Sequence, residues 1–278
     1  MATISETLKS ATTQLQSSSD SAHLDVELLL SFILEKDRSF LHTWPEQMLS
    51  AEQQEKFNAL FSQRLHGHPI AHLLGEQGFW SLNLKVTPDT LIPRPETECL
   101  VEIALETIPK HQPCHLLDLG TGSGAIALAI ATERPLCKIT ATDISASALA
   151  VAEENARTHQ IKNIHFIQSS WFENIPPQQF DMIVSNPPYI REKDEHLSEG
   201  DVRFDPISAL TSGEDGLDDI RTIIQLAPAF LRANAMMLIE HGYDQAQAVQ
   251  QIYAESNFTN IQNFTDYASH ARVTVALR

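Results

Sequence analysis

Long apolar runs are missing from this 278-residue sequence. No stretch approaches the roughly 20 consecutive apolar residues that a membrane-spanning helix needs, so we expect no such helix. The first fifteen residues are polar and lack a basic region followed by an apolar one, and we therefore expect no secretory signal. The hydrophobic fraction is nevertheless 42%, which suffices for a sizeable core and excludes the disordered and fibrous classes.

Cysteine is also scarce. The three cysteines, Cys99, Cys114 and Cys137, are widely spaced and lie in apolar surroundings. An odd number without paired spacing predicts reduced, buried thiols in a cytoplasmic protein. Three histidines lie within residues 66–72, but no matching cysteine or acidic set accompanies them, so we predict no metal site.

Basic residues are few in comparison with acidic ones. Lys and Arg number 19 against 36 Asp and Glu, which gives a net charge of −17, and no run of Lys or Arg occurs. Proteins that hold nucleic acid usually carry a basic patch that neutralises phosphates. The charge balance therefore favours a partner that is small, neutral or basic, unless the fold gathers a local basic groove.

The first third of the sequence has helical patterns. Asp20 is positioned to cap a helix whose apolar side chains repeat at helical spacing: Leu24, Leu28, Leu29, Phe32 and Ile33. Ser50 begins a capping box, and a second apolar series follows it: Phe57, Leu60, Phe61 and Leu65. We predict a helical domain over residues 1–70, close to the lower size limit for independent stability. Residues 71–91, interrupted by Gly75 and Gly78, predict a β-hairpin connector.

Residues 92–278 alternate between strand and helix candidates. Pro93 and Pro95 forbid a helix before Pro95, which suits a first helical turn. The strand candidates are residues 115–119, 138–142, 164–168, 182–185, 236–240, 261–264 and 273–277. One helix candidate begins near Gly124, and three others span residues 145–159, 217–231 and 244–256. This alternation predicts a doubly wound, Rossmann-like seven-stranded α/β sheet, preceded by the small helical domain.

A glycine-rich loop follows the first of these strands. It consists of Gly120, Thr121, Gly122, Ser123 and Gly124. Glycines at such a turn permit close backbone approach to a ligand, although many strand-to-helix turns use glycine for packing alone. The Gly-x-Gly-x-Gly spacing differs from the dinucleotide pattern, and no Lys-Ser or Lys-Thr follows as in a phosphate-binding loop.

An acidic residue at the end of the next strand favours a nucleoside ligand. Asp143 can accept hydrogen bonds from both ribose hydroxyls, and its alternative role is to cap the helix that begins at Ser145. Asp118, just before the glycine loop, would repel a pyrophosphate but suits a cationic methionine end. The loop and the two carboxylates together favour S-adenosyl-L-methionine over a dinucleotide.

The third motif is the tetrapeptide Asn186, Pro187, Pro188 and Tyr189, which directly follows a strand candidate. The carboxyl ends of parallel strands are where open α/β sheets bind ligands. The Asn186 side-chain oxygen and the Pro187 carbonyl can each accept one hydrogen of an NH₂ group, and Tyr189 can stack on the planar group that carries it. Because Asn-Pro is also a common turn former, the tetrapeptide alone is equally consistent with a rigid turn.

The chemistry of an amide acceptor explains why such a motif is needed. An amide nitrogen is a poor nucleophile because its lone pair is delocalised into the carbonyl. Accepting both N–H bonds as the nitrogen becomes pyramidal stabilises the developing positive charge more than the ground state. We predict Asn186, Pro187 and Tyr189 as catalytic residues and the whole tetrapeptide as the substrate contact. Since no general base is required, Glu240 is assigned a structural role.

With these motifs in place, the sequence resembles the HemK/PrmC family, the glutamine methyltransferases that modify the Gly-Gly-Gln loop of peptide chain release factors. The resemblance covers nearly the whole chain, including residues 91–98, 118–124, 143, 171–172, 186–189, 240–242 and 272–273. It implies a cytoplasmic S-adenosyl-L-methionine-dependent protein-(glutamine-N5) methyltransferase that supports translation termination. Residues 92–278 would form its methyltransferase domain, and residues 1–70 would help to dock the release factor.

The resemblance also implies the cofactor contacts, which are Gly120, Thr121, Gly122, Ser123, Gly124, Asp143, Trp171 and Asn186. In one departure, Ser170 stands where many relatives carry an Asp that can accept the adenine amino group. The stretch 191–205, which contains charges of both signs, is predicted to be a mobile loop over the acceptor site.

Two other functions fit parts of the sequence. Adenine and guanine amino methyltransferases share the Asn-Pro-Pro-Tyr motif, but extruding a base demands phosphate contacts that an acidic composition disfavours. A non-catalytic binder on the same fold would not need the intact tetrapeptide. We therefore predict a release-factor glutamine methyltransferase that binds no nucleic acid directly and no membrane.

Overall fold

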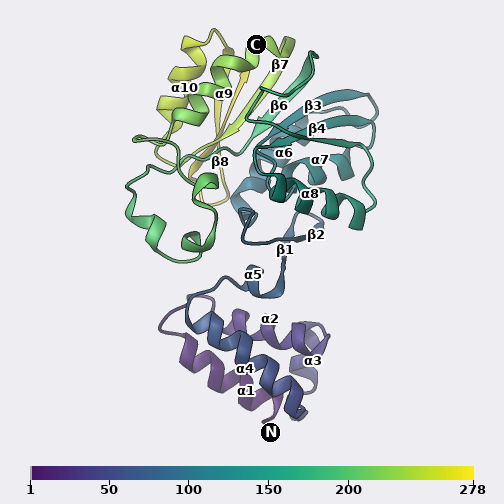
Figure 1. Ribbon diagram of the computed structural model, residues 1–278, viewed down its shortest axis with the longest axis vertical. Helices are drawn as coiled ribbons and strands as arrows, with labels where there is room; N and C mark the ends of the chain where they lie inside the picture. Colours follow the sequence, from purple (N-terminus) through teal and green to yellow (C-terminus); the bar gives the residue numbers. More distant parts are fainter. Residues whose placement is uncertain (1) are drawn as a thin grey trace. The chain divides into compact units, whose positions relative to one another are not determined.

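The computed structural model describes residues 2–278. The chain folds into two compact units (Figure 1). The helical unit contains the residues up to Glu76 together with Ser198–Phe204. The sheet unit contains Gln77–Leu197 and Asp205–Arg278. Within residues 2–278, no helix combines the length and apolar character required to cross a membrane.

The helical unit is built from five helices. They are α1 (Ile4–Leu15), α2 (Ala22–Leu34), α3 (Arg38–Thr43), α4 (Ala51–Leu65) and α5 (Ile70–Leu74). The predicted capping box at Ser50 is confirmed, because Ser50 and Gln53 satisfy each other's backbone N–H groups at 3.1 and 2.9 Å. Phe57 and Phe61 of α4 stack with ring centroids 5.4 Å apart and help to fill the core of this unit.

The predicted start and buried face of α2 are wrong. Ser21, not Asp20, occupies the N-cap position, and it makes no side-chain cap. Leu24 and Phe32 are 40% and 47% exposed, while the buried face carries Val26, Leu29 and Leu30. The face is rotated because Asp25 turns inward, where its carboxylate pairs with the buried Arg64 at 2.8 Å.

The sheet unit contains a seven-stranded sheet of order β5-β4-β3-β6-β7-β9-β8. Its strands are β3 (Cys114–Leu119), β4 (Cys137–Asp143), β5 (Ile164–Gln168), β6 (Phe180–Ser185), β7 (Leu231–Glu240), β8 (Thr259–Thr265) and β9 (Ala271–Leu277). Its helices are α6 (Glu98–Thr107), α7 (Ala125–Glu133), α8 (Ala146–Thr158), α9 (Asp218–Leu226) and α10 (Ala246–Glu255). The predicted doubly wound α/β fold is confirmed.

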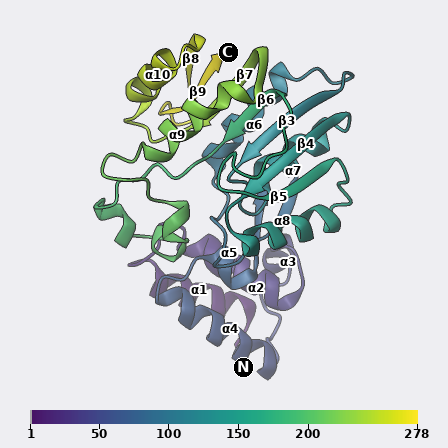
Figure 2. The ribbon, with the colours of Figure 1, turned by 45° about the horizontal axis from the view of Figure 1, so that its top comes forward.

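Alternation along the central strands supplies two separate cores. On β3, Leu116 belongs to the core beneath α6 and α7, whereas the next residue, Leu117, belongs to the core beneath α9 and α10. Successive strand side chains point to opposite faces, so an apolar run buried on both sides is needed. The helices therefore cover both faces of the sheet, as Figures 1 and 2 show.

The last strands depart from the predicted parallel arrangement. β9 lies between β7 and β8 and is antiparallel to both. Only residues 266–270 join β8 to β9, and a parallel neighbour would require a crossover of a dozen or more residues. A separate two-stranded sheet, β1 (Glu76–Phe79) and β2 (Leu82–Lys85), lies within the segment where a hairpin connector is predicted.

The prediction for the cysteines is wrong for two of the three. A disulfide joins Cys114 and Cys137, the first residues of β3 and β4, which are partners in the parallel register. The chain passes through α7 between the two strands, so the two cysteines are 23 residues apart. This spacing gives no indication in the sequence that they pair. Cys99 is the remaining free, buried cysteine.

The short helix η1 (Pro95–Thr97) precedes α6, so the predicted helical start at Pro95 is confirmed. Arg94 and the backbone N–H of Ile92 both bond to the buried Asp205 carboxylate, at 2.5 and 3.2 Å. These bonds fix residues 92–97 at the carboxyl edge of the sheet, where the candidate site lies.

Candidate active site

The site lies where the winding of the sheet reverses. β3 has β4 on one side and β6 on the other, and the loops that follow β3 and β6 leave in opposite directions. Open α/β sheets bind ligands at such switch points, outside the carboxyl ends of the strands. The glycine-rich loop follows β3, and the tetrapeptide that begins at Asn186 follows β6.

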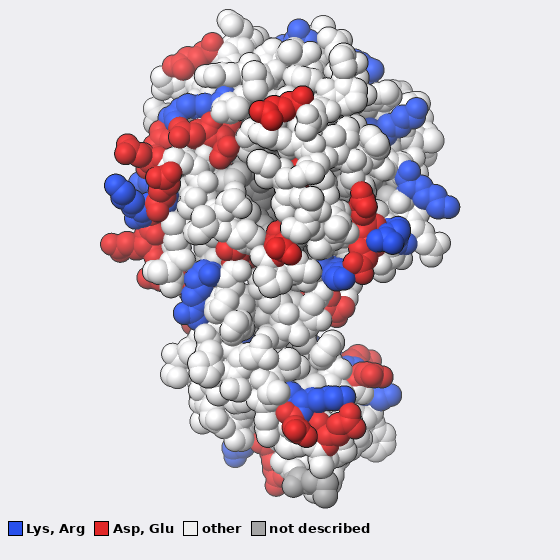
Figure 3. All heavy atoms as spheres, viewed as in Figure 1, with Lys and Arg blue, Asp and Glu red and all other residues white. Residues whose placement is uncertain are grey.

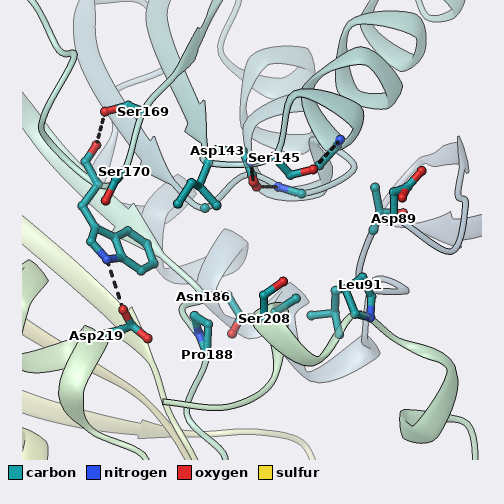
Figure 4. A pocket seen from close by; sticks show the side chains of 18 of the residues that line it. Asp89, Leu91, Asp143, Ser145, Ser169, Ser170, Asn186, Pro188, Ser208 and Asp219 are labelled. Atoms are coloured by element: carbon teal, nitrogen blue, oxygen red, sulfur yellow. Dashed lines mark hydrogen bonds between the residues drawn. The ribbon is translucent and has the colours of Figure 1, made fainter. Parts of the chain in front are cut away.

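A cavity of about 450 Å³ opens there (Figure 4). One side, the glycine-loop wall, is formed by Gly120, Gly122, residues 143–145, Ala148, residues 169–171 and Asp219. The other side, the Asn186 wall, is formed by Asn186 and Pro188 together with residues 88–91, Pro206, Ser208 and Ala209. The structure thus brings the two predicted motifs into one cavity of the size that small-molecule sites usually have.

The glycine-rich loop divides its residues between the cavity and the interior. Gly120 and Gly122 line the cavity with φ of 72° and 57°, which a side chain would strain. Thr121, Ser123 and Gly124 do not line it. A Cβ at Gly124 would lie 2.9 Å from Leu128 Cδ1, so this glycine is needed for packing.

Asp143 is held by the backbone around it. Its two carboxylate oxygens accept hydrogen bonds from the N–H groups of Gly122 and Ser145, at 2.8 and 2.9 Å. Burial raises the pKa of Asp143, and these backbone bonds oppose the shift. Ser145, rather than Asp143, supplies the side-chain cap of α8. Each carboxylate oxygen retains a lone pair that can accept from a ligand hydroxyl.

Asp118 is a buried carboxyl behind the glycine-loop wall. Its Oδ2 accepts a hydrogen bond from the Thr121 hydroxyl at 2.6 Å, while its Oδ1 has no partner among residues 2–278. Burial raises the pKa of Asp118 to about 7, and the nearby Asp143 charge acts in the same direction. Asp118 is 0% exposed and does not line the cavity, so it stands behind the glycine loop rather than in the cavity itself.

Trp171 has an unusual backbone, with φ of 46°. The indole N–H donates to Asp219 Oδ1 at 3.1 Å, and the backbone carbonyl accepts from the Ser169 hydroxyl at 3.0 Å (Figure 4). The indole ring also passes within 3.4 Å of where a Cβ on Gly120 would stand. Ser170 lines the cavity beside it. Asp219 on α9 was not predicted, because nothing in the sequence links it to a residue 48 positions away.

The four residues of the tetrapeptide have different environments. Asn186 and Pro188 line the cavity, whereas Pro187 is buried and does not line it. Tyr189 does not line it and instead packs against the core beneath α9 and α10. Its carbonyl accepts from Gln245 Nε2 at 2.9 Å, and burial together with the Glu240 charge raises its pKa.

The predicted mobile loop over the acceptor site is partly tied down. Ser198–Phe204 belongs to the helical unit, where Asp201 lies 3.5 Å from Arg64 and the Arg203 guanidinium donates to the carbonyl of His66. The ring of Phe204 lies 4.5 Å from that of His68. These contacts indicate an ordered segment.

Charge on the molecule is mixed. On the face drawn in Figure 3, the basic side chains of the described residues are scattered and form no continuous stripe. Such a stripe is the usual footprint of nucleic-acid binding.

Two family models match the chain: the Methyltransferase small domain at residues 99–201 and the PrmC N-terminal domain at residues 6–75. The release factor glutamine methyltransferase of Escherichia coli (strain K12) is 48% identical over 268 residues, which cover 96% of each chain. That of Vibrio cholerae serotype O1 is 50% identical over 275 residues, which cover 98% of this chain and 96% of the other. Among solved structures, a methyltransferase from Pyrococcus furiosus matches with a TM-score of 0.54 and 14% identity. The match covers 78% of this chain and 96% of that one, and it shows the fold alone.

Proposed function

The chain belongs to the release factor glutamine methyltransferase family, and on that basis we propose its reaction. It transfers the methyl group of S-adenosyl-L-methionine to the side-chain amide nitrogen of the glutamine in the Gly-Gly-Gln loop of a peptide chain release factor. The observation that carries the proposal is that Asn186 and Pro188 line the same cavity as Gly120, Gly122 and Asp143. An amide acceptor and a nucleoside cofactor can therefore meet in it.

The glycine-loop wall fits the cofactor. Asp143 lines the cavity and has the free lone pairs to accept ribose hydroxyls. The buried Asp118 behind the loop favours the cationic methionine end by its charge rather than by contact. Trp171, locked by its bond to Asp219, offers a flat surface to the adenine. S-adenosyl-L-methionine, when bound, supplies an electrophilic methyl group on a sulfonium centre.

The Asn186 wall fits the acceptor. The Asn186 side-chain oxygen and the Pro187 carbonyl accept the two N–H hydrogens of the glutamine amide, which holds its nitrogen toward the glycine-loop wall. As the nitrogen becomes pyramidal, these two acceptors stabilise its growing positive charge. The rigid Pro187–Pro188 backbone keeps them in place before the substrate arrives. The extra proton leaves to solvent after transfer.

The protein partner is the release factor, and the helical unit helps to dock it. The alternative acceptor, an adenine or guanine amino group, is disfavoured by the net charge of −17. Because release factors act in translation, the proposal places the protein in the cytoplasm.

Incubation with methyl-labelled S-adenosyl-L-methionine and either a purified release factor or total RNA and DNA tests the function. We expect label on the release factor, and mass spectrometry should locate it on the glutamine of the Gly-Gly-Gln loop. A release factor in which that glutamine is replaced by Ala is the control and should take up none. Label found in nucleic acid alone would overturn the proposal.

A further inference from the structure

Asn186 has two chemically different ends, and the proposed reaction uses only one of them. The side-chain oxygen must face the acceptor, because an NH₂ group in its place would repel the N–H groups of the substrate amide. Nothing in the Asn186 side chain itself selects this orientation. The selection has to come from the groups that contact it.

The structure shows one such group. Asn186 Nδ2 lies 3.1 Å from the hydroxyl oxygen of Thr97, a residue that is 4% exposed and ends the short helix η1. Thr97 is 89 positions away from Asn186 in the sequence. A hydroxyl can donate or accept, however, so Thr97 alone does not decide which end of the amide it holds.

Glu240 lies behind Thr97. It ends β7, is 1% exposed, and lies close enough to the Thr97 side chain for that hydroxyl to lower the pKa of the Glu240 carboxyl. The Tyr189 hydroxyl also donates to Glu240 Oε1, at 3.5 Å. The second oxygen, Oε2, has no partner among residues 2–278. A carboxylate only accepts hydrogen bonds, so the negative charge of an ionised Glu240 orients the hydrogen of the nearby Thr97 hydroxyl toward it. The Thr97 oxygen must then accept from Asn186 Nδ2.

We propose that Thr97 and Glu240 are positioning residues that hold the Asn186 amide with its oxygen toward the acceptor. The inference rests on the proposed function and adds to it a polar relay of three side chains from separate segments. Its direction is set at the buried end, where Glu240 can only accept. The relay also gives the residues 92–98 a role in the reaction.

The relay makes turnover dependent on pH. Burial raises the pKa of Glu240 to about 7, while Thr97, Arg272 and Tyr189 lower it and Glu96 raises it. The other titratable neighbour is Cys99 on α6, whose thiol is near enough to respond to the Glu240 charge. When Glu240 is protonated it can donate to Thr97, and the amide of Asn186 is then free to turn its NH₂ toward the acceptor. The kcat for release-factor methylation should therefore fall as the pH drops through about 7.

Three variants and a matched control test the relay. Thr97→Val removes the hydroxyl at nearly constant volume, and Thr97→Ser keeps it. Glu240→Gln replaces a group that only accepts hydrogen bonds with an amide that can either donate to Thr97 or accept from it. Thr107→Val is the control, because Thr107 is an exposed threonine at the other end of α6 whose hydroxyl donates to the carbonyl of Ile103 at 3.2 Å. Each protein is assayed with a release factor over about pH 5–9, a range of about two units on either side of the Glu240 pKa. Cofactor affinity is measured by calorimetry and folding by thermal unfolding.

We expect Thr97→Val to lower kcat by about 10- to 100-fold, while cofactor affinity stays within about threefold. Thr97→Ser and Thr107→Val should stay within about threefold of wild type. Glu240→Gln should lower kcat by about tenfold and abolish its loss at acidic pH. A folded Thr97→Val or Glu240→Gln protein with wild-type kcat and pH profile would overturn the relay. Failure of the wild type to methylate any release factor would instead overturn the proposed function.

Discussion

The two walls of the cavity are assembled in different ways. The glycine-loop wall takes its polar contacts mainly from one loop and the end of the adjacent strand: Gly122 N–H bonds to Asp143, and Thr121 bonds to Asp118. The Asn186 wall depends on side chains from distant segments, since Asn186 bonds to Thr97 and the Tyr189 carbonyl to Gln245. A cofactor site of the first kind can be recognised from a contiguous motif. An acceptor site of the second kind cannot be read in full from its tetrapeptide, and damage to the two walls should have different kinetic signatures.

The largest effect should come from the Asn186 wall. Asn186→Ala removes a contact that strengthens only as charge develops on the amide nitrogen, so kcat should fall by about 100- to 1,000-fold. Cofactor affinity should stay within about tenfold. Steady-state kinetics and calorimetry measure the two quantities. An Asn186→Ala protein that keeps most of its activity would show that the proposed acceptor geometry is wrong.

The glycine-loop wall should show the opposite pattern. Asp143→Ala deletes charge-assisted hydrogen bonds to the ribose, and we expect cofactor affinity to weaken by roughly 10- to 100-fold. The kcat at saturating cofactor should change by less than about threefold, because the acceptor contacts are intact. If kcat fell as much as cofactor affinity, the two walls would not contribute separately to cofactor binding and to methyl transfer.

Stability should respond to Gly124 more than to its neighbour in the loop. Gly124→Ala places a Cβ 2.9 Å from Leu128 Cδ1 and 3.2 Å from Ala152 Cβ at a φ of 88°, so we expect a loss of about 1–3 kcal/mol in the free energy of unfolding. Gly122→Ala is the matched control, because nothing lies within 4 Å of its Cβ. Urea denaturation should show the smaller loss for Gly122→Ala, and equal losses would contradict the packing role.

The smallest effect concerns Trp171. Trp171→Phe keeps an aromatic surface but loses the 3.1 Å bond to Asp219, which should cost about 0.5–1.5 kcal/mol of unfolding free energy. The binding of cofactor, measured by calorimetry, should weaken only a few-fold. Asp219→Asn, which retains an acceptor for the indole N–H, is expected to be milder, and the reverse order would argue against the bond.

The sheet could be predicted closely because its signals are local. The central strands β3 and β6 appear as short apolar runs, because burial on both faces makes such runs continuous, whereas the edge strands β5 and β8 are partly exposed and carry weaker patterns. Pairing between elements could not be predicted. The β9 strand is antiparallel, Cys114 meets Cys137 through a crossover, and α2 turns Asp25 inward to meet Arg64. Each of these depends on a partner far away in the sequence.

The same limit applies to the site. Gly120, Gly122, Asp143, Trp171 and Asn186 were predicted, and all of them line the cavity. Thr97, Asp219 and the position of Glu240 behind Thr97 were not. The hydrogen bonds from Trp171 to Asp219 and from Asn186 to Thr97 join residues that are 48 and 89 positions apart in the sequence. A single threonine or aspartate is not part of a sequence motif that predicts a hydrogen bond to a distant residue.

Ser198–Phe204 are part of the helical unit, although in the sequence they lie between two segments of the sheet unit. A fragment that ends at Glu76 would lack the Asp201 carboxylate beside Arg64, the Arg203 side chain over Gly67 and the ring that faces His68. The helical unit is thus not an interchangeable module that a gene fusion could transfer in one piece. Its last seven residues are encoded within the other unit, so an insertion or deletion there alters both units at once.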